Sequence, residues 1–133
     1  MELEFPGAVP EIPVKDVNEA AAYYEKNLGF RVDWGGEELG LAGISKGDCR
    51  MFLANSDYRK IRGNVAPVLI WLNLNSRDEV NDLYQLWSSS NAKLISEPQS
   101  QPWGLHEFTA QDLDGNLFRV FYDFGTQESG NGA

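Results

Sequence analysis

The spacing of hydrophobic residues changes several times along the chain, and these changes predict an order of strands and helices. Residues 8–14 are extended, because two prolines in this segment disfavour a helix. Asp16 and Glu19 then have the spacing of a helix N-cap, and apolar residues recur at helical spacing up to Gly29, which predicts a helix of about three turns. Three strand-like segments follow, at residues 30–34, 39–45 and 49–54. The first half therefore predicts a βαβββ unit.

The second half of the chain shows the same order of patterns. Residues 67–74 have a strong strand pattern, and Ser76 with Glu79 marks the start of a helix. One apolar face of that helix carries Val80, Leu83, Tyr84 and Trp87. Strand-like segments follow at residues 93–96, 106–110 and 117–124, with a loop at 98–104 and a turn at 112–116. Two tandem βαβββ units are therefore the main signal of organisation.

The length of the chain sets the number of domains. A chain of 133 residues and 14.9 kDa can bury a core of its own without disulfides or a structural metal. We therefore expect one α+β domain spanning residues 1–133. Within it we predict a first module at residues 8–54, a linker at 55–64, a second module at 65–124 and a polar tail at 125–133.

Charge narrows the range of partners. Eleven Lys and Arg residues stand against twenty Asp and Glu residues, which gives a formal net charge of -9. Nucleic acid is a poor partner for such a chain, because its affinity rests mainly on basic residues that neutralise phosphates. The acidity either favours a cationic ligand or simply keeps the protein in solution.

Cysteine use and the N-terminal residues bear on the compartment. Cys49 is the only cysteine, which excludes an intrachain disulfide and a cysteine-rich zinc site and suits a reducing compartment. The first residues lack the basic and apolar regions of a signal peptide, and no stretch approaches the roughly 20 apolar residues of a membrane span. We expect a cytoplasmic protein with no membrane partner.

The motifs at both ends of this order resemble those of a known family. They comprise the opening segment with Tyr24 and Leu28-Gly29-Phe30, the pair Leu83-Tyr84 with Trp87, and Pro102-Trp103-Gly104 followed by Glu107-Phe108, Asp112 and Gly115-Asn116. In this order they resemble the vicinal oxygen chelate superfamily of glyoxalases, extradiol dioxygenases and antibiotic-resistance proteins, and most closely its bleomycin-resistance branch. The resemblance implies two modules that form half-open mixed sheets around a cleft. It also implies a homodimer that exchanges its N-terminal strand, with Pro10 setting the direction of that strand, and that holds a drug at the subunit boundary.

Enzymes of that superfamily hold a divalent metal with His, Gln or Glu from four strand positions. The resemblance places these positions near Val9, Met51, Leu69 and Arg119, of which three are apolar and one is a cation. Such side chains do not bind a divalent metal. His106 is the only histidine, so a two-histidine site cannot form within one chain. We expect no metal, no cofactor and no catalytic residue.

Aromatic and polar residues supply the candidate ligand contacts. Trp103 in its Pro-Trp-Gly loop can stack on a flat ligand, and the family's matching tryptophan lines the drug cleft. Trp71 and Asn73 alternate along one strand and share a face, on the cleft side or in the core. The remaining candidates are Trp34 with the neighbouring carboxylates Glu37 and Glu38, His106 as a polar contact or an ordinary strand histidine, and Arg119 as a charge inside the cleft.

These observations predict a metal-free homodimer that binds and sequesters a planar, cationic antibiotic of the bleomycin type without chemistry. Two alternatives remain open. The first is a glyoxalase- or dioxygenase-like lyase or isomerase whose metal ligands are displaced. The second is a binding protein for an endogenous small aromatic molecule.

Overall fold

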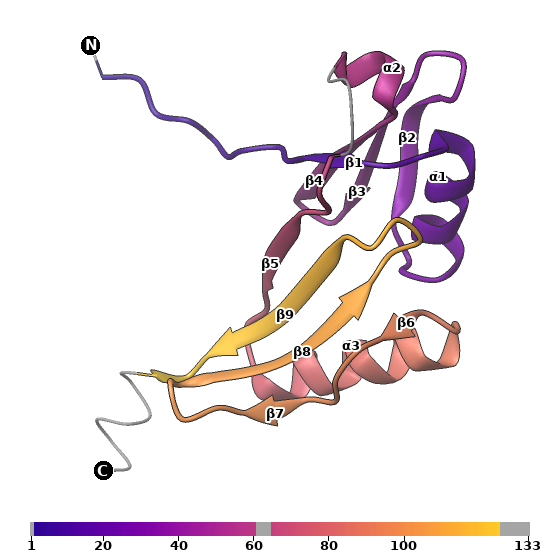
Figure 1. Cartoon of the computed structure of the whole chain (residues 1–133). Coiled ribbons are helices and arrows are strands. Elements are labelled where there is room, and N and C mark those ends of the chain that lie inside the picture. The colour runs from indigo at the N-terminus through magenta and orange to yellow at the C-terminus, as the bar shows by residue number, and fades with distance from the viewer. Residues whose placement is uncertain (1, 61–64, 126–133) are drawn as a thin grey trace.

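The computed structural model describes residues 2–60 and 65–125, and its first sheet is built by the N-terminal half of the chain (Figure 1). The strands pair in the order β1-β4-β3-β2, with β1 parallel to β4 and the other neighbours antiparallel. Helix α1 packs on one face of this sheet. The elements are β1 (Glu11–Pro13), α1 (Val17–Lys26), β2 (Arg31–Gly36), β3 (Leu41–Lys46) and β4 (Cys49–Ala54).

The second sheet repeats this plan. Its strands pair in the order β5-β9-β8-β6, with β5 parallel to β9, and β7 adds to β8 within the segment predicted as a loop. The elements are β5 (Leu69–Asn73), α3 (Arg77–Ser89), β6 (Lys93–Leu94), β7 (Gln99–Ser100), β8 (Leu105–Gln111) and β9 (Leu117–Asp123). The expected α+β fold of two unclosed, mixed βαβββ-like modules is confirmed.

Two predicted segments lie partly outside the described residues. The linker predicted at 55–64 contains the short helix α2 (Ser56–Arg59), whose N-cap is Asn55, and its residues 61–64 are not described. Of the tail predicted at 125–133, only Gly125 is described.

The helices begin where the sequence predicts. The Asp16 carboxylate accepts a hydrogen bond from the backbone N–H of Glu19 at 2.8 Å, and the Ser76 hydroxyl accepts one from Glu79 at 3.1 Å. The Glu79 carboxylate in turn accepts from the backbone N–H of Asn75 at 3.0 Å. Gly29 follows α1 with φ of +72°, a backbone conformation that favours glycine. Local capping chemistry therefore sets both helix starts.

One hydrophobic core runs through both modules. The Tyr24 ring on α1 meets Phe30 and Phe118 edge to face, with ring centres 5.7 Å and 5.9 Å apart. The Trp87 indole on α3 donates to the backbone carbonyl of Leu28 at 2.9 Å. The two helical layers are thus packed together. Within residues 2–60 and 65–125, no helix has the length and apolar character needed to cross a membrane.

The turn between β8 and β9 ties the second module to the first. The Asp112 carboxylate accepts from the Tyr24 hydroxyl at 2.6 Å and from the Asn116 side-chain amide at 2.8 Å. That amide also donates to the backbone carbonyl of Pro13 at 2.9 Å. Burial, and then the charge of Asp112, raise the pKa of Tyr24 well above its usual value, so the phenol stays a donor. We call this group, with Tyr24, Asp112, Asn116 and Pro13, the inter-module clamp.

Candidate functional site

The face of the first sheet turned away from α1 carries aromatic side chains. Met51 and Leu53 point into the core, so Phe52 between them points to the opposite face. The Trp34 ring lies beside Phe52, with ring centres 5.2 Å apart, and Trp34 remains 40% exposed. Glu11 pairs with Phe52 across the β1–β4 ladder. We call this surface the open face of the first sheet.

A β-bulge brings Trp34 to this face. Val32 pairs with Ile44 and packs on the core, but the register shifts at the next residue, so that Trp34 pairs with Gly43. An extra residue in one strand reverses the side to which the following side chains point. The Trp34 ring lies directly over Gly43, where the Cβ atom of any other residue would overlap the indole. Only glycine at position 43 leaves room for the ring.

The second sheet has a similar open face, on the side away from α3. Trp71 and Asn73 lie on it as predicted for residues that share one face, and Trp71 is 42% exposed. Phe121 meets the Trp71 ring edge to face at 5.4 Å between ring centres. The Arg119 guanidinium lies over the same ring, 5.1 Å from its centre. Trp71, Asn73 and Arg119 therefore belong to one surface.

A cavity of about 550 Å³ lies along β5, the strand that ends the pairing order of the second sheet, between α3 and the first module. Trp71 and Asn73 line it from β5, and the hairpin tip between β3 and β4 lines it from the first module. Leu83 and Trp87 of α3 contribute apolar wall. Burial raises the pKa of the Cys49 thiol at its rim, so the thiol is protonated at neutral pH. The cavity is therefore mainly apolar, with a volume in the range of small-molecule sites.

Glu37 and Glu38, expected beside Trp34, lie in the turn after β2. The Glu37 carboxylate accepts from the backbone N–H of Val17 at 2.5 Å and from the Asn55 amide at 2.9 Å. It thereby provides a hydrogen-bond acceptor for a backbone N–H in the first turn of α1, where the helix dipole favours a negative charge. Glu37 is thus engaged in holding the fold, whereas Glu38 is exposed.

His106 lies on the opposite side of the second sheet from Trp71. Its ring nitrogens bond to the side chains of two neighbours, Nδ1 to Ser100 Oγ at 2.9 Å and Nε2 to Asn81 Oδ1 at 2.8 Å. Its register partner on β9 is Tyr122, one residue beyond the open-face residue Phe121. The structure therefore places His106 among polar partners on the α3 side, apart from the other candidates.

His106 gives a prediction on pH dependence. Burial, and then the charge of Arg77, lower the pKa of His106 from its usual value of 6.5. The unfolded chain therefore binds the proton more tightly, so the stabilisation is complete above about pH 6.5 and is lost as the pH falls through the lowered pKa. Between about pH 7.5 and pH 5, we expect the wild-type melting temperature to fall further than that of His106→Gln. An equal fall in the melting temperature of the two proteins over this pH range would contradict this expectation.

Trp103 lies in the loop before β8 and is 63% exposed. Gly104 fixes this loop with φ of +92°, and its carbonyl accepts from the backbone N–H of Phe124 at 3.0 Å. The loop is at the end of the β8–β9 hairpin farthest from the inter-module clamp (Figure 1). Trp103 therefore lies at the end of the second sheet away from the clamp, whereas Trp34 lies on the first sheet.

Pro10 lies where the chain enters the first sheet. Its carbonyl accepts from the backbone N–H of Phe52 at 3.0 Å, and the following strand β1 pairs with β4 of the same chain. Residues 2–9 extend away from the body on the side opposite α1 (Figure 1). Leu3 and Phe5 on this N-terminal arm are 84% and 95% exposed.

The strand positions matched to metal ligands carry no suitable set of donors. Met51 lies in the core, so the outward position on β4 shifts to Phe52 or Arg50. Leu69 and Arg119 face away from α3, and only Glu11 on β1 offers a carboxylate. Among residues 2–60 and 65–125, no three His, Cys, Asp or Glu residues are grouped so that they could hold one metal ion. These residues do not fit a divalent metal centre.

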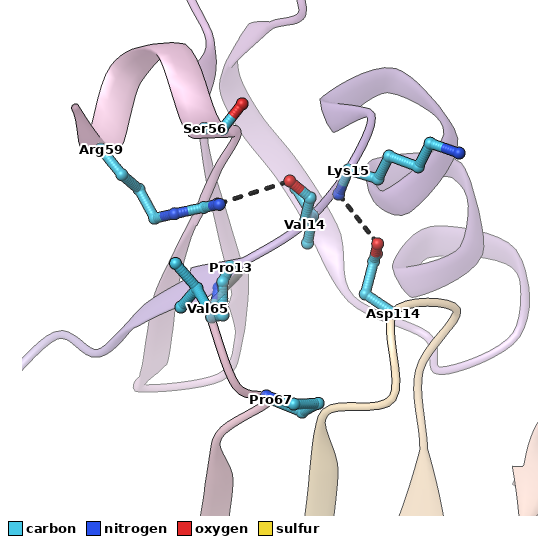
Figure 2. Close-up of a pocket in the computed structure, with 8 residues that line it drawn as sticks. All are labelled: Pro13, Val14, Lys15, Ser56, Arg59, Val65, Pro67 and Asp114. Carbon is cyan, nitrogen blue, oxygen red and sulfur yellow. Dashed lines mark hydrogen bonds between the residues drawn. The ribbon is translucent and has the colours of Figure 1, made fainter. Parts of the chain in front are cut away.

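A smaller pocket of about 270 Å³ lies at the junction of the modules (Figure 2). The backbone N–H of Lys15 donates to the Asp114 carboxylate at 2.8 Å, and the Arg59 guanidinium donates to the carbonyl of Val14 at 3.4 Å. The Lys15 side chain points away from Asp114 in this view. The Lys15–Asp114 hydrogen bond joins the two modules, as the clamp does, whereas the Arg59–Val14 hydrogen bond lies within the N-terminal half.

Sequence reasoning missed several residues of the open faces. The pattern marks Phe52 and Phe121 only as strand residues, although each contacts an exposed tryptophan. It gives no signal at Gly43. Glu107 enters the sequence analysis only within the motif Glu107-Phe108, yet this residue lies on the open face opposite Phe121. Alternation from Trp71 through the β5–β9–β8 register was the signal that could have found Phe121 and Glu107.

The fold and its sequence pattern define a family. Residues 8–120 match the profile of the Glyoxalase/Bleomycin resistance protein/Dioxygenase superfamily, and the chain belongs to that superfamily. The superfamily includes both enzymes and binding proteins, so membership alone does not decide between chemistry and binding. No curated protein matches the chain in sequence.

Solved structures share the fold at low sequence identity. A glyoxalase/bleomycin resistance protein/dioxygenase from Nocardioides has a TM-score of 0.74 at 14% identity, covering 94% of this chain and 88% of its own. A bleomycin-binding protein in complex with bleomycin has a TM-score of 0.70 at 23% identity, with 90% and 99% covered. The bleomycin-binding protein of Streptomyces verticillus, in complex with copper(II)-bleomycin, has a TM-score of 0.67 at 24% identity, with 93% and 99% covered. This chain is therefore similar in fold to proteins that bind a drug.

Proposed function

We propose that this protein binds a flat, cationic aromatic molecule of the bleomycin type and sequesters it without chemical change. The observation that carries the proposal is the pair of exposed tryptophans on the open faces. Trp34 and Trp71 each keep about two-fifths of their surface exposed, whereas the aromatic residues Tyr24, Trp87 and Phe108 are buried in the core. Exposed rings held by neighbouring aromatics are suited to stacking on a planar ligand.

The charges and donors of the chain favour binding over metal-dependent chemistry. The net charge of -9 attracts a cation at long range. The strand positions that face outward offer aromatic rings and Arg119 in place of a metal-ligand set. The similarity in fold to two bleomycin-binding proteins supports the same ligand class.

We also propose that the protein acts as a homodimer. Strands β1 and β5 end the pairing order of their sheets, so each has one edge without a neighbouring strand in that order. Unpaired edges with exposed apolar side chains such as Leu69 favour association. The N-terminal arm, with Leu3 and Phe5 exposed, offers a further segment that a second chain can cover. Exchange of this arm at Pro10 would continue the direction in which it leaves the body.

A second chain would also complete the ligand site. The clamp turn lies at one end of the β8–β9 hairpin and the Trp103 loop lies at the other. Because β8 has seven residues, these two ends are about 20 Å apart. Trp34 lies on β2 of the first sheet, which is at the clamp end of this hairpin (Figure 1). One flat ligand can therefore be stacked between Trp34 and Trp103 only if the two residues come from different chains.

Isothermal titration calorimetry with metal-free bleomycin tests the proposed function. We expect saturable binding at one drug per chain, with the drug recovered unchanged. Metal analysis of protein purified without chelator is the companion measurement. One tightly held divalent ion per chain, together with turnover of a glyoxalase or dioxygenase substrate, would replace our proposal with the enzyme alternative. Absence of binding by bleomycin and by other planar cations would also overturn it.

Light scattering tests the proposed dimer. We expect a mass of twice the 14.9 kDa of one chain at micromolar concentration, because the free edges and the exposed arm favour a closed pair. Removing residues 1–9 should shift the mass toward one chain if the arm is exchanged. A full-length protein that runs as a single chain would contradict the dimer.

A further inference from the structure

Glu107 is a buried carboxylate whose charge has no partner among the described residues. It lies on β8, where Phe121 of β9 and Gln99 of β7 are its register partners. Glu107 is only 9% exposed, and its Oε2 atom is shut off from solvent without a hydrogen bond in the described part of the chain. Buried carboxylates are normally paired or hydrogen-bonded, because removal from water is costly. An unpaired buried carboxylate oxygen indicates that a bound cation or hydrogen-bond donor is the missing partner.

Arg119, the cation on the same face, does not pair with the Glu107 carboxylate. Arg119 lies on β9 two residues before Phe121, but its guanidinium lies over the Trp71 ring. No cation within residues 2–60 and 65–125 forms an ion pair with Glu107, and Arg31 is paired with Asp33 on the other sheet. The negative charge of Glu107 therefore remains available on the open face.

The surroundings of Glu107 have the composition of a site for an organic cation. Phe121 is its direct cross-strand neighbour, and Trp71 meets Phe121 edge to face. Aromatic rings attract cations through their π-electrons, and an adjacent carboxylate adds a charge-assisted contact. The Trp103 loop precedes the same strand, so a stacked ring and a charged group of one ligand could be held by neighbouring parts of β8.

We propose that Glu107 is the residue that recognises the positive charge of the ligand. The inference rests on the proposed function, and it assigns to Glu107 the role that the sequence suggested for Glu37 and Glu38. The Glu37 carboxylate is bound to Val17 and Asn55 in the fold. The group that Glu107 takes is an organic cation, such as a sulfonium, a quaternary ammonium or a protonated amine, seated against Phe121 and Trp71.

Two forms of one drug separate this inference from the proposed function. Bleomycin A2 ends in a sulfonium cation, whereas its demethyl form ends in a neutral thioether of nearly the same shape. We expect the wild type to bind the cationic form about tenfold more tightly and Glu107→Gln to bind both forms alike. Equal affinity of the wild type for the two forms would overturn the role of Glu107 and leave the proposed function standing. Failure of the wild type to bind either form would overturn both.

A measurement without ligand provides an independent check. If Glu107 lacks a partner in the free protein, Glu107→Gln should raise the melting temperature by about 3 to 8 °C, because an uncompensated buried charge is removed. Glu79→Gln is the matched control, since glutamine keeps an oxygen that can accept from the Asn75 backbone and only the charge at the start of α3 is lost, so the melting temperature should fall slightly. A fall for Glu107→Gln like that of Glu79→Gln would show that Glu107 has a structural partner, and the inference would fail.

Discussion

Replacing Asp112 by Ala is expected to lower the free energy of unfolding by about 3 to 5 kcal/mol, the range for breaking a buried charged network. Asp112 is 1% exposed and accepts four hydrogen bonds. Two come from the side chains of Tyr24 and Asn116, and two from the backbone N–H groups of Asp114 and Asn116. Without the carboxylate these donors are left buried and unpaired. Urea unfolding followed by tryptophan fluorescence measures the change.

Two variants control for the effect at Asp112. Asp112→Asn keeps one acceptor oxygen, so it should cost less than Asp112→Ala. Asp57→Ala removes an exposed carboxylate from the first turn of α2 and should change the free energy of unfolding by less than about 1 kcal/mol. A loss at Asp112→Ala as small as that at Asp57→Ala would show that the clamp does not stabilise the fold.

Replacing Trp71 by Ala is expected to weaken the binding of bleomycin by about 10- to 100-fold, equivalent to roughly 1 to 3 kcal/mol. The Trp71 ring is partly exposed on the open face, where it is positioned by Phe121 and Arg119. Loss of the ring removes stacking surface and leaves little of the core disturbed. Calorimetry gives the dissociation constant, and a melting curve shows whether the fold is kept.

Leu86→Ala is the control for Trp71→Ala. Leu86 is an exposed apolar residue on α3, on the other side of the second sheet from Trp71. Its removal should leave the affinity for bleomycin unchanged. Unchanged affinity of the Trp71→Ala variant would exclude the open face of the second sheet as the drug site.

Much of the fold could be predicted from local chemistry in the sequence. The N-caps at Asp16 and Ser76 and the left-handed Gly29 each depend on neighbours within a few residues. The predicted turn at 112–116 is also local, because Asp112 accepts hydrogen bonds from the backbone of Asp114 and Asn116. Such signals are visible in one sequence, and the structure confirms the expected order of modules.

The face to which Trp34 points could not be predicted in this way. Strict alternation would place Trp34 on the same side as Val32, which packs on the core. The bulge after Val32 reverses the direction, and it is seen only once β2 is paired with β3. Strand register depends on residues far away in the chain, which periodicity within β2 does not report.

The roles of the polar candidates also depended on distant partners. Glu37 meets Val17 twenty residues earlier, and His106 meets Asn81 twenty-five residues earlier. Nothing near these residues in sequence shows that their hydrogen-bonding capacity is used inside the fold. The same holds for Glu107, whose lack of a partner is apparent only when the neighbouring strands β7 and β9 are in place.

The inter-module clamp has a consequence for how the chain folds during synthesis. Its hydrogen bonds join Tyr24 to Asp112 and Pro13 to Asn116, across 88 and 103 positions of sequence. The first strand and helix emerge early from the ribosome, but their clamp partners emerge only near the end of translation. Until then Tyr24 has no acceptor at Asp112 and no contact with Phe118. The first module therefore cannot form its clamp contacts until the β8–β9 hairpin has been synthesised. Because contacts between residues far apart in sequence form slowly, we expect the two modules to pack together late and slowly.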